Sequence, residues 1–213
     1  MIADPARDQI LRSIRENLTK SAPDVAHAPS DHGPPEPRVP SPEPPDLVER
    51  FTTQLEAVGA QWTLVRGEAE AARALRRILA DAGARRVAGS DAALVARVLP
   101  ERLMGGGLSR EELFACDAGV TTAQWGIAET GTLVLESARE QHRLLSLVPP
   151  IHVALLSTRC ICASLGDALA RVSRDSHAIT FITGPSRTSD IELTLVIGVH
   201  GPQTVHVLLL EDA

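Results

Sequence analysis

The chain has 213 residues, of which 44% are hydrophobic, 23% charged and only 2% aromatic. This length allows one large domain, or one domain and a tail, and the core has to be built from aliphatic side chains. The formal net charge is −6 and the basic residues are spread along the chain, which argues against a nucleic-acid binder with its usual basic stripe.

The N-terminal part is predicted to lie outside the main domain. The apolar positions of residues 5–20 recur at helical spacing, which predicts a short amphipathic helix. Residues 22–45 hold nine of the fifteen prolines and almost no large apolar residue, a composition typical of an extended linker. We therefore divide the chain into an N-terminal helix in residues 1–21, this Pro-rich linker, and an α/β domain in residues 46–213. The helix docks either on a partner or on its own domain.

From residue 46 onward, helical patterns alternate with short apolar runs. We predict helices in residues 47–58, 68–82 and 92–98, and strands in residues 62–65 and 86–88. Such alternation is typical of right-handed crossovers and a mainly parallel sheet.

The C-terminal half continues this pattern after a glycine-rich connection in residues 104–109. Its three consecutive glycines do not match the dinucleotide-binding fingerprint. Further on we predict a strand, a turn and a strand in 118–137, a helix in 140–147, a strand in 151–156, a helix in 161–172, a strand in 178–183 and a closing hairpin made of 193–199 and 205–210.

The sequence predicts no metal or redox cofactor in this chain. Cys116, Cys160 and Cys162 are too few for an iron–sulfur cluster, and they are interpreted as buried structural thiols. The seven histidines show no metal-binding spacing. Because no apolar run approaches about 18 residues and the N-terminus lacks the pattern of a signal peptide, we expect a cytoplasmic protein.

A first candidate site is the turn around Glu129, the candidate catalytic residue, with Thr130, Gly131 and Thr132 as candidate ligand-binding residues. A carboxylate in a tight turn between strands can act as a base, a nucleophile or a hydrogen-bond acceptor. A solvated hairpin turn would have the same sequence, so the pattern alone leaves both interpretations open.

A second candidate segment follows the strand predicted in residues 178–183. Its hydroxyls and its arginine, at the opening of an expected helical turn, could bind an anion at the carboxyl end of a strand. A capping box made by Ser189 and Glu192 would explain part of the segment without any ligand. The candidate ligand-binding residues here are Gly184, Ser186, Arg187, Thr188, Asp190 and Glu192, together with His200 in a later glycine-flanked turn.

Together these segments resemble the lactate utilization protein C (LUD domain) family. The resemblance rests on residues 128–133, 143–150, 183–192 and 198–202, and it covers about residues 46–211. This family is similar in fold to the ribose-5-phosphate isomerase, glucosamine-phosphate deaminase and CoA-transferase group. The resemblance therefore implies a Rossmann-like three-layer α/β/α sandwich with a mainly parallel sheet, to which the pattern adds a C-terminal hairpin.

The resemblance also implies a role in the oxidation of L-lactate to pyruvate, beside companion proteins that carry iron–sulfur clusters. In this interpretation Arg187, with the hydroxyls of Ser186 and Thr188, binds a small anion, and Glu129 orients or deprotonates it. We expect the Glu129 and Arg187 side chains to face the same cleft.

Two alternatives remain at this stage. The turn formed by Glu129, Thr130 and Gly131 is similar to the Glu-x-Gly turn of CoA-transferases, which implies an acyl- or formyl-transferring enzyme of the CoA-transferase or formyltetrahydrofolate cyclo-ligase type with Glu129 as the nucleophile. The other alternative is a binding module without turnover.

Overall fold

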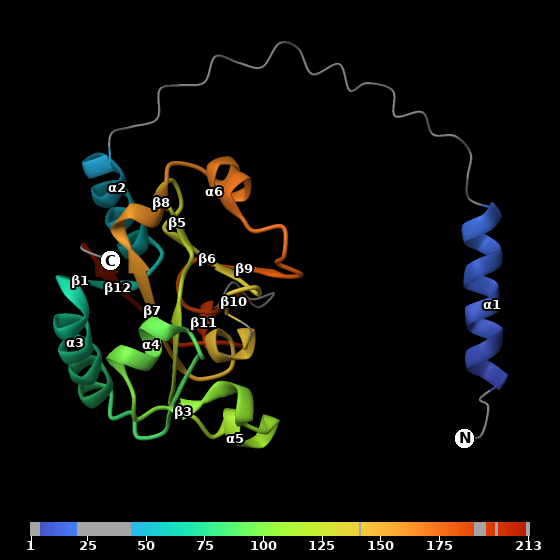
Figure 1. Cartoon of the computed structure of the whole chain (residues 1–213), viewed down its shortest axis with the longest axis horizontal. Coiled ribbons are helices and arrows are strands. Elements are labelled where there is room, and N and C mark those ends of the chain that lie inside the picture. The colour runs from blue at the N-terminus through green and yellow to red at the C-terminus, as the bar shows by residue number, and fades with distance from the viewer. Residues whose placement is uncertain (1–4, 21–43, 141, 190–194, 199, 212–213) are drawn as a thin grey trace, which may run out of the picture. The chain divides into compact units, whose positions relative to one another are not determined.

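The structure is a computed structural model that describes residues 5–20, 44–140, 142–189, 195–198 and 200–211. It falls into two units, Met1–Pro40 and Ser41–Ala213. In the first unit, helix α1 (Pro5–Lys20) leaves Ile10 and Ile14 exposed. The second unit carries every other helix and strand labelled in Figure 1.

The second unit is organised around a six-stranded sheet in which all neighbouring strands are parallel. The strand order is β1-β12-β7-β4-β2-β3. The central strands β7 and β12 are almost continuously apolar because both of their faces are covered. The six strands are β1 (Gln61–Val65), β2 (Val87–Gly89), β3 (Leu103–Met104), β4 (Ala118–Thr122), β7 (Ile151–Ser157) and β12 (Thr204–Leu210).

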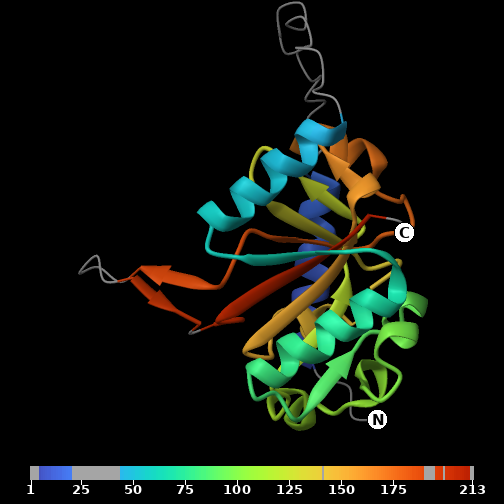
Figure 2. The same cartoon turned by 90° about the vertical axis from the view of Figure 1, so that its left-hand side faces the viewer.

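Successive residues of the central strands pack into different layers, as the alternation of side chains along a strand requires. Leu208 of β12 packs with Leu75 of α3, and Leu209 packs with Phe51 and Leu55 of α2. Figure 2 shows α2 on one face of the sheet and α3 on the other. These helices are α2 (Pro44–Ala57), α3 (Gly67–Asp81) and, on the α3 side, α4 (Ala93–Val98).

A second, four-stranded sheet shares the α2 face. Its order is β8-β5-β6-β9, and β5–β6 and β6–β9 are antiparallel whereas β5–β8 is parallel. Helix α6 (Leu165–Arg171) packs on it through Ala168. The strands are β5 (Trp125–Ile127), β6 (Thr132–Glu136), β8 (Ile161–Cys162) and β9 (Ile179–Ile182).

The predicted fold class is confirmed, since a mainly parallel sheet lies between layers that contain helices. The helices predicted in residues 47–58, 68–82 and 92–98 correspond to α2, α3 and α4. The sequence does not predict a second sheet: β6 and β9 lie in segments predicted as strands, β5 lies in the predicted turn between two strands, and β8 lies inside a predicted helix.

The predicted closing hairpin paired the wrong strands. Residues 205–210 belong to β12, which pairs in parallel with β1 and β7 in the middle of the large sheet. The hairpin of this region is formed instead by β10 (Arg187–Ser189) and β11 (Leu195–Ile197), and it projects from the body in Figure 2. A run of residues that is buried on both faces is typical of a central parallel strand rather than of a hairpin arm.

Two predicted helices also need correction. The helix expected in 140–147 is only a 3₁₀ turn, Arg143–Ser146, and it is preceded by a buried Glu140 whose hydrogen bonds hold the chain against β4. The helix expected in 161–172 starts at Leu165, because Ile161 and Cys162 pair with β5 and Ser164 provides the N-cap.

The glycine-rich connection of residues 104–109 contains part of β3 and the 3₁₀ turn Gly105–Gly107. It is followed by an unpredicted short helix, α5 (Arg110–Phe114), which a Ser109–Glu112 capping box begins. All three cysteines are free, and Cys116 and Cys162 are buried as predicted, whereas Cys160 is only partly buried. No helix in the described part of the chain is both long and apolar enough to cross a bilayer.

Candidate functional site

The carboxyl ends of β4 and β7 border a pocket of about 560 Å³. Thr122 ends β4 and Ser157 ends β7, and Ala92, just before α4, completes one side. From β2 the chain adds β3 at the edge of the sheet, and the later strands β4, β7 and β12 are then added on the other side of β2. The direction in which successive strands are added therefore reverses between β2 and β4. Open α/β sheets bind ligands in the crevice at such a reversal.

Two arginines line this pocket without an ion-pair partner among the described residues. Arg139 follows β6, and Arg171 is the last residue of α6. The Arg171 guanidinium carbon lies 5.5 Å from the centre of the Trp125 ring, an arrangement that favours a fixed guanidinium plane. Arginine binds carboxylates through paired N–H donors, so the pocket offers cationic groups suited to a small anion.

The inner wall of the pocket is a connected polar network around the buried Glu136. Its Oε1 accepts a hydrogen bond from Trp125 Nε1 at 2.9 Å, and its Oε2 accepts from Ser173 N at 2.7 Å and Ser176 Oγ at 3.0 Å. The backbone N–H of Glu136 donates to Gln124 Oε1 at 2.7 Å. Because every oxygen named here has a donor, the wall is held rigid where the two sheets meet.

A second buried carboxyl group belongs to Glu140, whose backbone N–H donates to the carbonyl oxygen of Glu136 at 2.8 Å. Its Oε1 accepts hydrogen bonds from Thr122 N at 2.7 Å, from Thr122 Oγ1 and from Ser90 Oγ at 3.2 Å. Its Oε2 is buried and has no partner among the described residues. Burial raises the pKa of Glu140, although the hydrogen bonds from Thr122 and Ser90 act in the opposite direction.

Arg139, Glu140 and Arg171 are not among the site residues predicted from the sequence. Arg139 lies between two predicted elements, and Glu140 and Arg171 lie in segments that are predicted as helices. The only signal in the sequence was a pair of charged residues, Arg139 and Glu140, at the point where an apolar strand gives way to a short connection.

Cys160 also lines the pocket. Burial raises the pKa of the Cys160 thiol despite the opposing effect of Arg139 and Arg171. A thiol that is protonated at neutral pH is a weak nucleophile. In the described ranges no three His, Cys, Asp or Glu side chains are arranged to hold a metal ion.

The sequence-predicted turn at Glu129 lies at a different pocket, of about 360 Å³, between the second sheet and α6. Glu129, Thr130 and Thr132 all line it. The Oε1 of Glu129 accepts the backbone N–H of Leu165 at 2.8 Å, and the hydroxyls of Thr130 and Thr132 are 2.7 Å apart. The rest of the lining is mainly apolar and includes Ile127, Leu165, Leu169 and Phe181.

The two predicted ligand-binding glycines lie against helix α2. A Cβ on Gly131 would lie 2.6 Å from the carbonyl carbon of Gln54, and a Cβ on Gly184 would lie 2.5 Å from the carbonyl oxygen of Val58. Both glycines have positive φ. Close packing against the helix therefore explains why both positions are glycine.

The second predicted segment does not form a helical turn, because residues 187–189 form β10. Arg187 Nη2 donates a hydrogen bond to the carbonyl oxygen of Val58 at the carboxyl end of α2, where a cation is favourable. Ser186 bonds through its backbone to Pro202 and Gly198. The structure thus places Ser186 beside the turn that contains the exposed His200.

The remaining residues of that prediction are only partly described. Thr188 pairs with Val196 between β10 and β11, and Asp190 and Glu192 lie outside the described residues. Arg187 does not line the pocket that Glu129 borders. The structure therefore brings Glu129 together with Thr130 and Thr132, but it does not bring Arg187 into their pocket.

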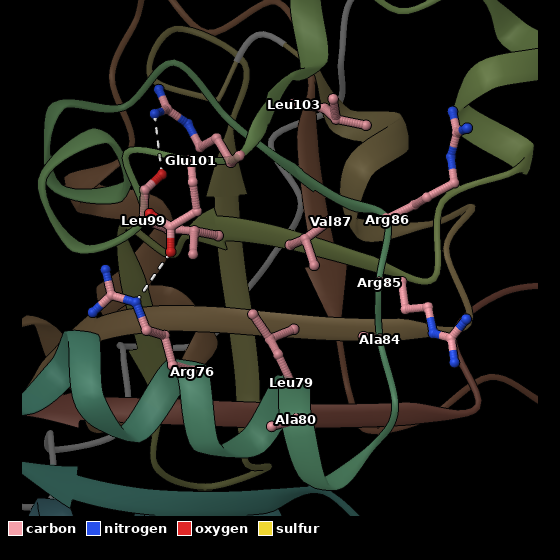
Figure 3. A pocket seen from close by; sticks show the side chains of 11 residues that line it. Arg76, Leu79, Ala80, Ala84, Arg85, Arg86, Val87, Leu99, Glu101 and Leu103 are labelled. Atoms are coloured by element: carbon pink, nitrogen blue, oxygen red, sulfur yellow. Dashed lines mark hydrogen bonds and ion pairs between the residues drawn. The ribbon is translucent and has the colours of Figure 1, made fainter.

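An arginine-lined pocket of about 450 Å³, shown in Figure 3, is a weaker candidate. Arg76 Nε donates to Glu101 Oε1 at 3.0 Å, which neutralises that arginine. The side chains of Arg85 and Arg86 point away from the cavity centre in Figure 3. This pocket also lies near the beginning of β2 at Val87, the end of the sheet opposite to the usual ligand crevice.

Comparison with known proteins assigns the second unit to a family. A family model described as the LUD domain matches residues 48–210. Over 99 residues the chain is 43% identical to an uncharacterized protein of Neisseria meningitidis serogroup B, covering 44% of this chain and 42% of that protein. Over 123 residues it is 36% identical to the lactate utilization protein C of Anoxybacillus flavithermus, covering 49% of this chain and 56% of that protein. The chain thus spans about half the length of these curated relatives.

A solved structure supports the same assignment. The crystal structure of a DUF162 family protein from Deinococcus radiodurans superposes with a TM-score of 0.64 at 25% sequence identity. The superposition covers 79% of this chain and 99% of that one.

Proposed function

The chain belongs to the LUD domain family, and from this premise we propose that it serves in lactate utilization by binding a small carboxylate. The relatives that carry the name lactate utilization protein C support the first part of the proposal. The pocket at the carboxyl ends of β4 and β7 supports the second.

The choice of a carboxylate as the ligand depends on one observation. Arg139 and Arg171 line the same pocket, and neither has an ion-pair partner among the residues that the structure describes. A carboxylate would supply the missing counter-charge and could accept two N–H bonds from either guanidinium. Lactate and pyruvate, each with one carboxylate and one neighbouring oxygen, are the smallest ligands of this class in the proposed process.

Electron transfer is assigned to partner proteins in this proposal. An iron–sulfur cluster usually needs four thiolates, whereas the chain has three cysteines, two of them buried. We therefore propose that the chain supplies the anion site and that iron–sulfur companion proteins carry the electrons. Affinity purification of the full chain from its native host, followed by iron analysis of the co-purified proteins, tests this part.

Calorimetric titration of the full chain with L-lactate and with pyruvate tests the anion site. Arg139→Gln and Arg171→Gln should each weaken binding about tenfold or more, because a hydrogen bond to a charged group contributes about 1.5–3 kcal/mol. Arg174→Gln, which changes an exposed arginine outside the pocket, is the matched control and should bind as the unmodified chain does.

Arg187→Gln provides the comparison with the sequence-predicted site. If Arg187→Gln abolishes binding while Arg139→Gln and Arg171→Gln leave the dissociation constants unchanged, the carboxyl-end pocket is not the anion site. Thermal melting of each variant separates lost binding from lost folding, which matters for Arg171 because its guanidinium stacks on Trp125.

The transferase alternative rests on the exposure of Glu129 at the mouth of its apolar pocket. Attack of its carboxylate on an acyl-CoA thioester would form a glutamyl anhydride and release the CoA thiolate. Mass spectrometry of the chain after incubation with acyl-CoA tests this reaction, and Glu129→Gln is the control that cannot form the adduct.

A further inference from the structure

Glu140 is a charged residue type in a place that is poorly suited to a charge. Its side chain is only 2% exposed, and no arginine or lysine forms an ion pair with it among the described residues. The charged neighbour that acts on it most directly is Asp91, which has the same sign. An unpaired buried carboxylate is strongly disfavoured, and such groups usually take up a proton instead.

The hydrogen bonds of Glu140 are also uneven. Three donors converge on Oε1, two from Thr122 and one from Ser90, whereas Oε2 is buried without a partner. In a carboxylate both oxygens carry charge, so the bare Oε2 would leave half of that charge without a donor. In a carboxylic acid the proton resides on Oε2, and leaving a neutral hydroxyl unpaired is less unfavourable than leaving a charge unpaired.

Glu140 is linked to the carboxyl-end pocket by two short connections. Thr122, whose hydroxyl donates to Glu140, lines the pocket and accepts a hydrogen bond from Gln124 Nε2 at 3.0 Å. Arg139, the preceding residue in the chain, lines the pocket itself. A negative charge on Glu140 would therefore oppose a bound anion, and a neutral Glu140 would not.

We propose that Glu140 is a positioning residue that carries a proton next to the anion site, so that an anion and this proton bind to the pocket together. The proposal rests on the proposed function for the identity of the anion, but not for the protonation of Glu140. The coupling is reciprocal, as any linkage between two bound species must be: the anion favours the proton, and the proton favours the anion.

The other ionisable groups around Glu140 are few. Asp91 follows β2, Arg102 donates through Nε to the carbonyl oxygen of Ser90, Glu136 lies in the wall of the pocket, and Arg139 and His142 flank Glu140 closely in the chain. The arginines keep their charge at all accessible pH values. Glu140→Gln retains all of these groups, so any pH dependence that arises from them persists in that variant.

Infrared difference spectroscopy tests the protonation without any ligand. The spectrum of the full chain minus that of Glu140→Gln at neutral pH should contain the carbonyl stretch of one protonated carboxyl group. Asp91→Asn removes the like charge and should shift the loss of this band to lower pH. A spectrum without the band, in which only ionised carboxylate is found, overturns the proposal.

Calorimetry with pyruvate, in buffers of different ionisation enthalpy, tests the coupling. As the pH rises through the range in which the infrared band disappears, the affinity of the unmodified chain should fall about fivefold or more, with uptake of protons on binding, and Glu140→Gln should lack this fall. An equal pH dependence in both proteins, or none in either, overturns the coupling. If pyruvate fails to bind the unmodified chain at any pH, the proposed function fails, and the infrared band still decides the state of Glu140.

Discussion

At the scale of single residues, the molecule is distinguished by polar side chains that are buried without a charged partner. Glu136 and Glu140 flank the carboxyl-end pocket, and His152 lies in the middle of β7. Burial of such groups is tolerated only where hydrogen bonds replace water, and each has at least one. Burial raises the pKa of Glu140 and lowers that of His152, so these two residues make the stability of the fold sensitive to pH.

His152 gives the clearest prediction of this kind. It is 0% exposed, its Nε2 lies 2.9 Å from Thr121 Oγ1, and burial lowers its pKa from 6.5 to about 4. The unfolded chain therefore binds more protons than the folded chain between these two values. Above pH 6.5 the neutral His152 does not reduce the free energy of unfolding. As the pH falls from 6.5 toward about 4, the free energy of unfolding decreases by about 3 kcal/mol in total because of this residue.

Urea unfolding of the full chain at a series of pH values measures this contribution. His152→Gln should flatten the dependence of the unfolding free energy on pH in the acid range. His200→Gln, which changes an exposed histidine, should leave the dependence as it is. An unchanged slope in His152→Gln would show that other groups dominate the acid sensitivity.

At the scale of elements, the decisive contact joins helix α2 to the second sheet. Phe51 and Leu55 of α2 pack against Leu133 and Leu135 of β6. The turn before β6 comes so close to the helix that only a glycine fits at residue 131. The turn residues that sequence analysis assigned to ligand binding thus also serve the packing of α2.

The matched pair Gly131→Ala and Gly67→Ala isolates this close approach. The two glycines have similar φ angles, 65° and 69°, but a Cβ on Gly67 would meet nothing within 4 Å. Gly67→Ala should therefore lower the free energy of unfolding by only about 1 kcal/mol, because alanine disfavours the left-handed backbone conformation. Gly131→Ala should cost about 1–3 kcal/mol more, because its Cβ collides with the α2 backbone. Equal losses in urea unfolding would mean that α2 moves away without penalty.

At the scale of the whole molecule, every buried core residue in the described part of the chain lies between Phe51 and Leu210. The two large apolar clusters, one on each face of the parallel sheet, are also contained in this range. The unit Ser41–Ala213 therefore possesses the buried surface that a stable domain requires.

A fragment of residues 41–213 should accordingly melt within about 2 °C of the full chain, which corresponds to less than about 1 kcal/mol for a domain of this size. Differential scanning calorimetry measures the difference. Ile14→Asp in the full chain, at an exposed position of α1, should likewise leave the melting temperature unchanged. A clearly lower value for both proteins would reveal a stabilising role of α1.

The amino-acid sequence by itself determined the fold class and the position of most regular elements. The periodicity of α2, α3 and α4 and the apolar runs of β7 and β9 are local properties that each segment carries alone. The motifs around Glu129 and Arg187 were likewise sufficient to indicate the family, which the family model confirms.

Only the tertiary structure decided which strands pair and which side chains meet. The apolar run of residues 205–210 suits a hairpin arm and a central strand equally well until its neighbours, β1 and β7, are known. Arg139, which follows β6, and Arg171, at the end of α6, line one pocket, and no local pattern encodes that approach. Long-range pairing fixed the candidate site, because residues far apart in the chain acquire a common environment only when the strands between them are placed.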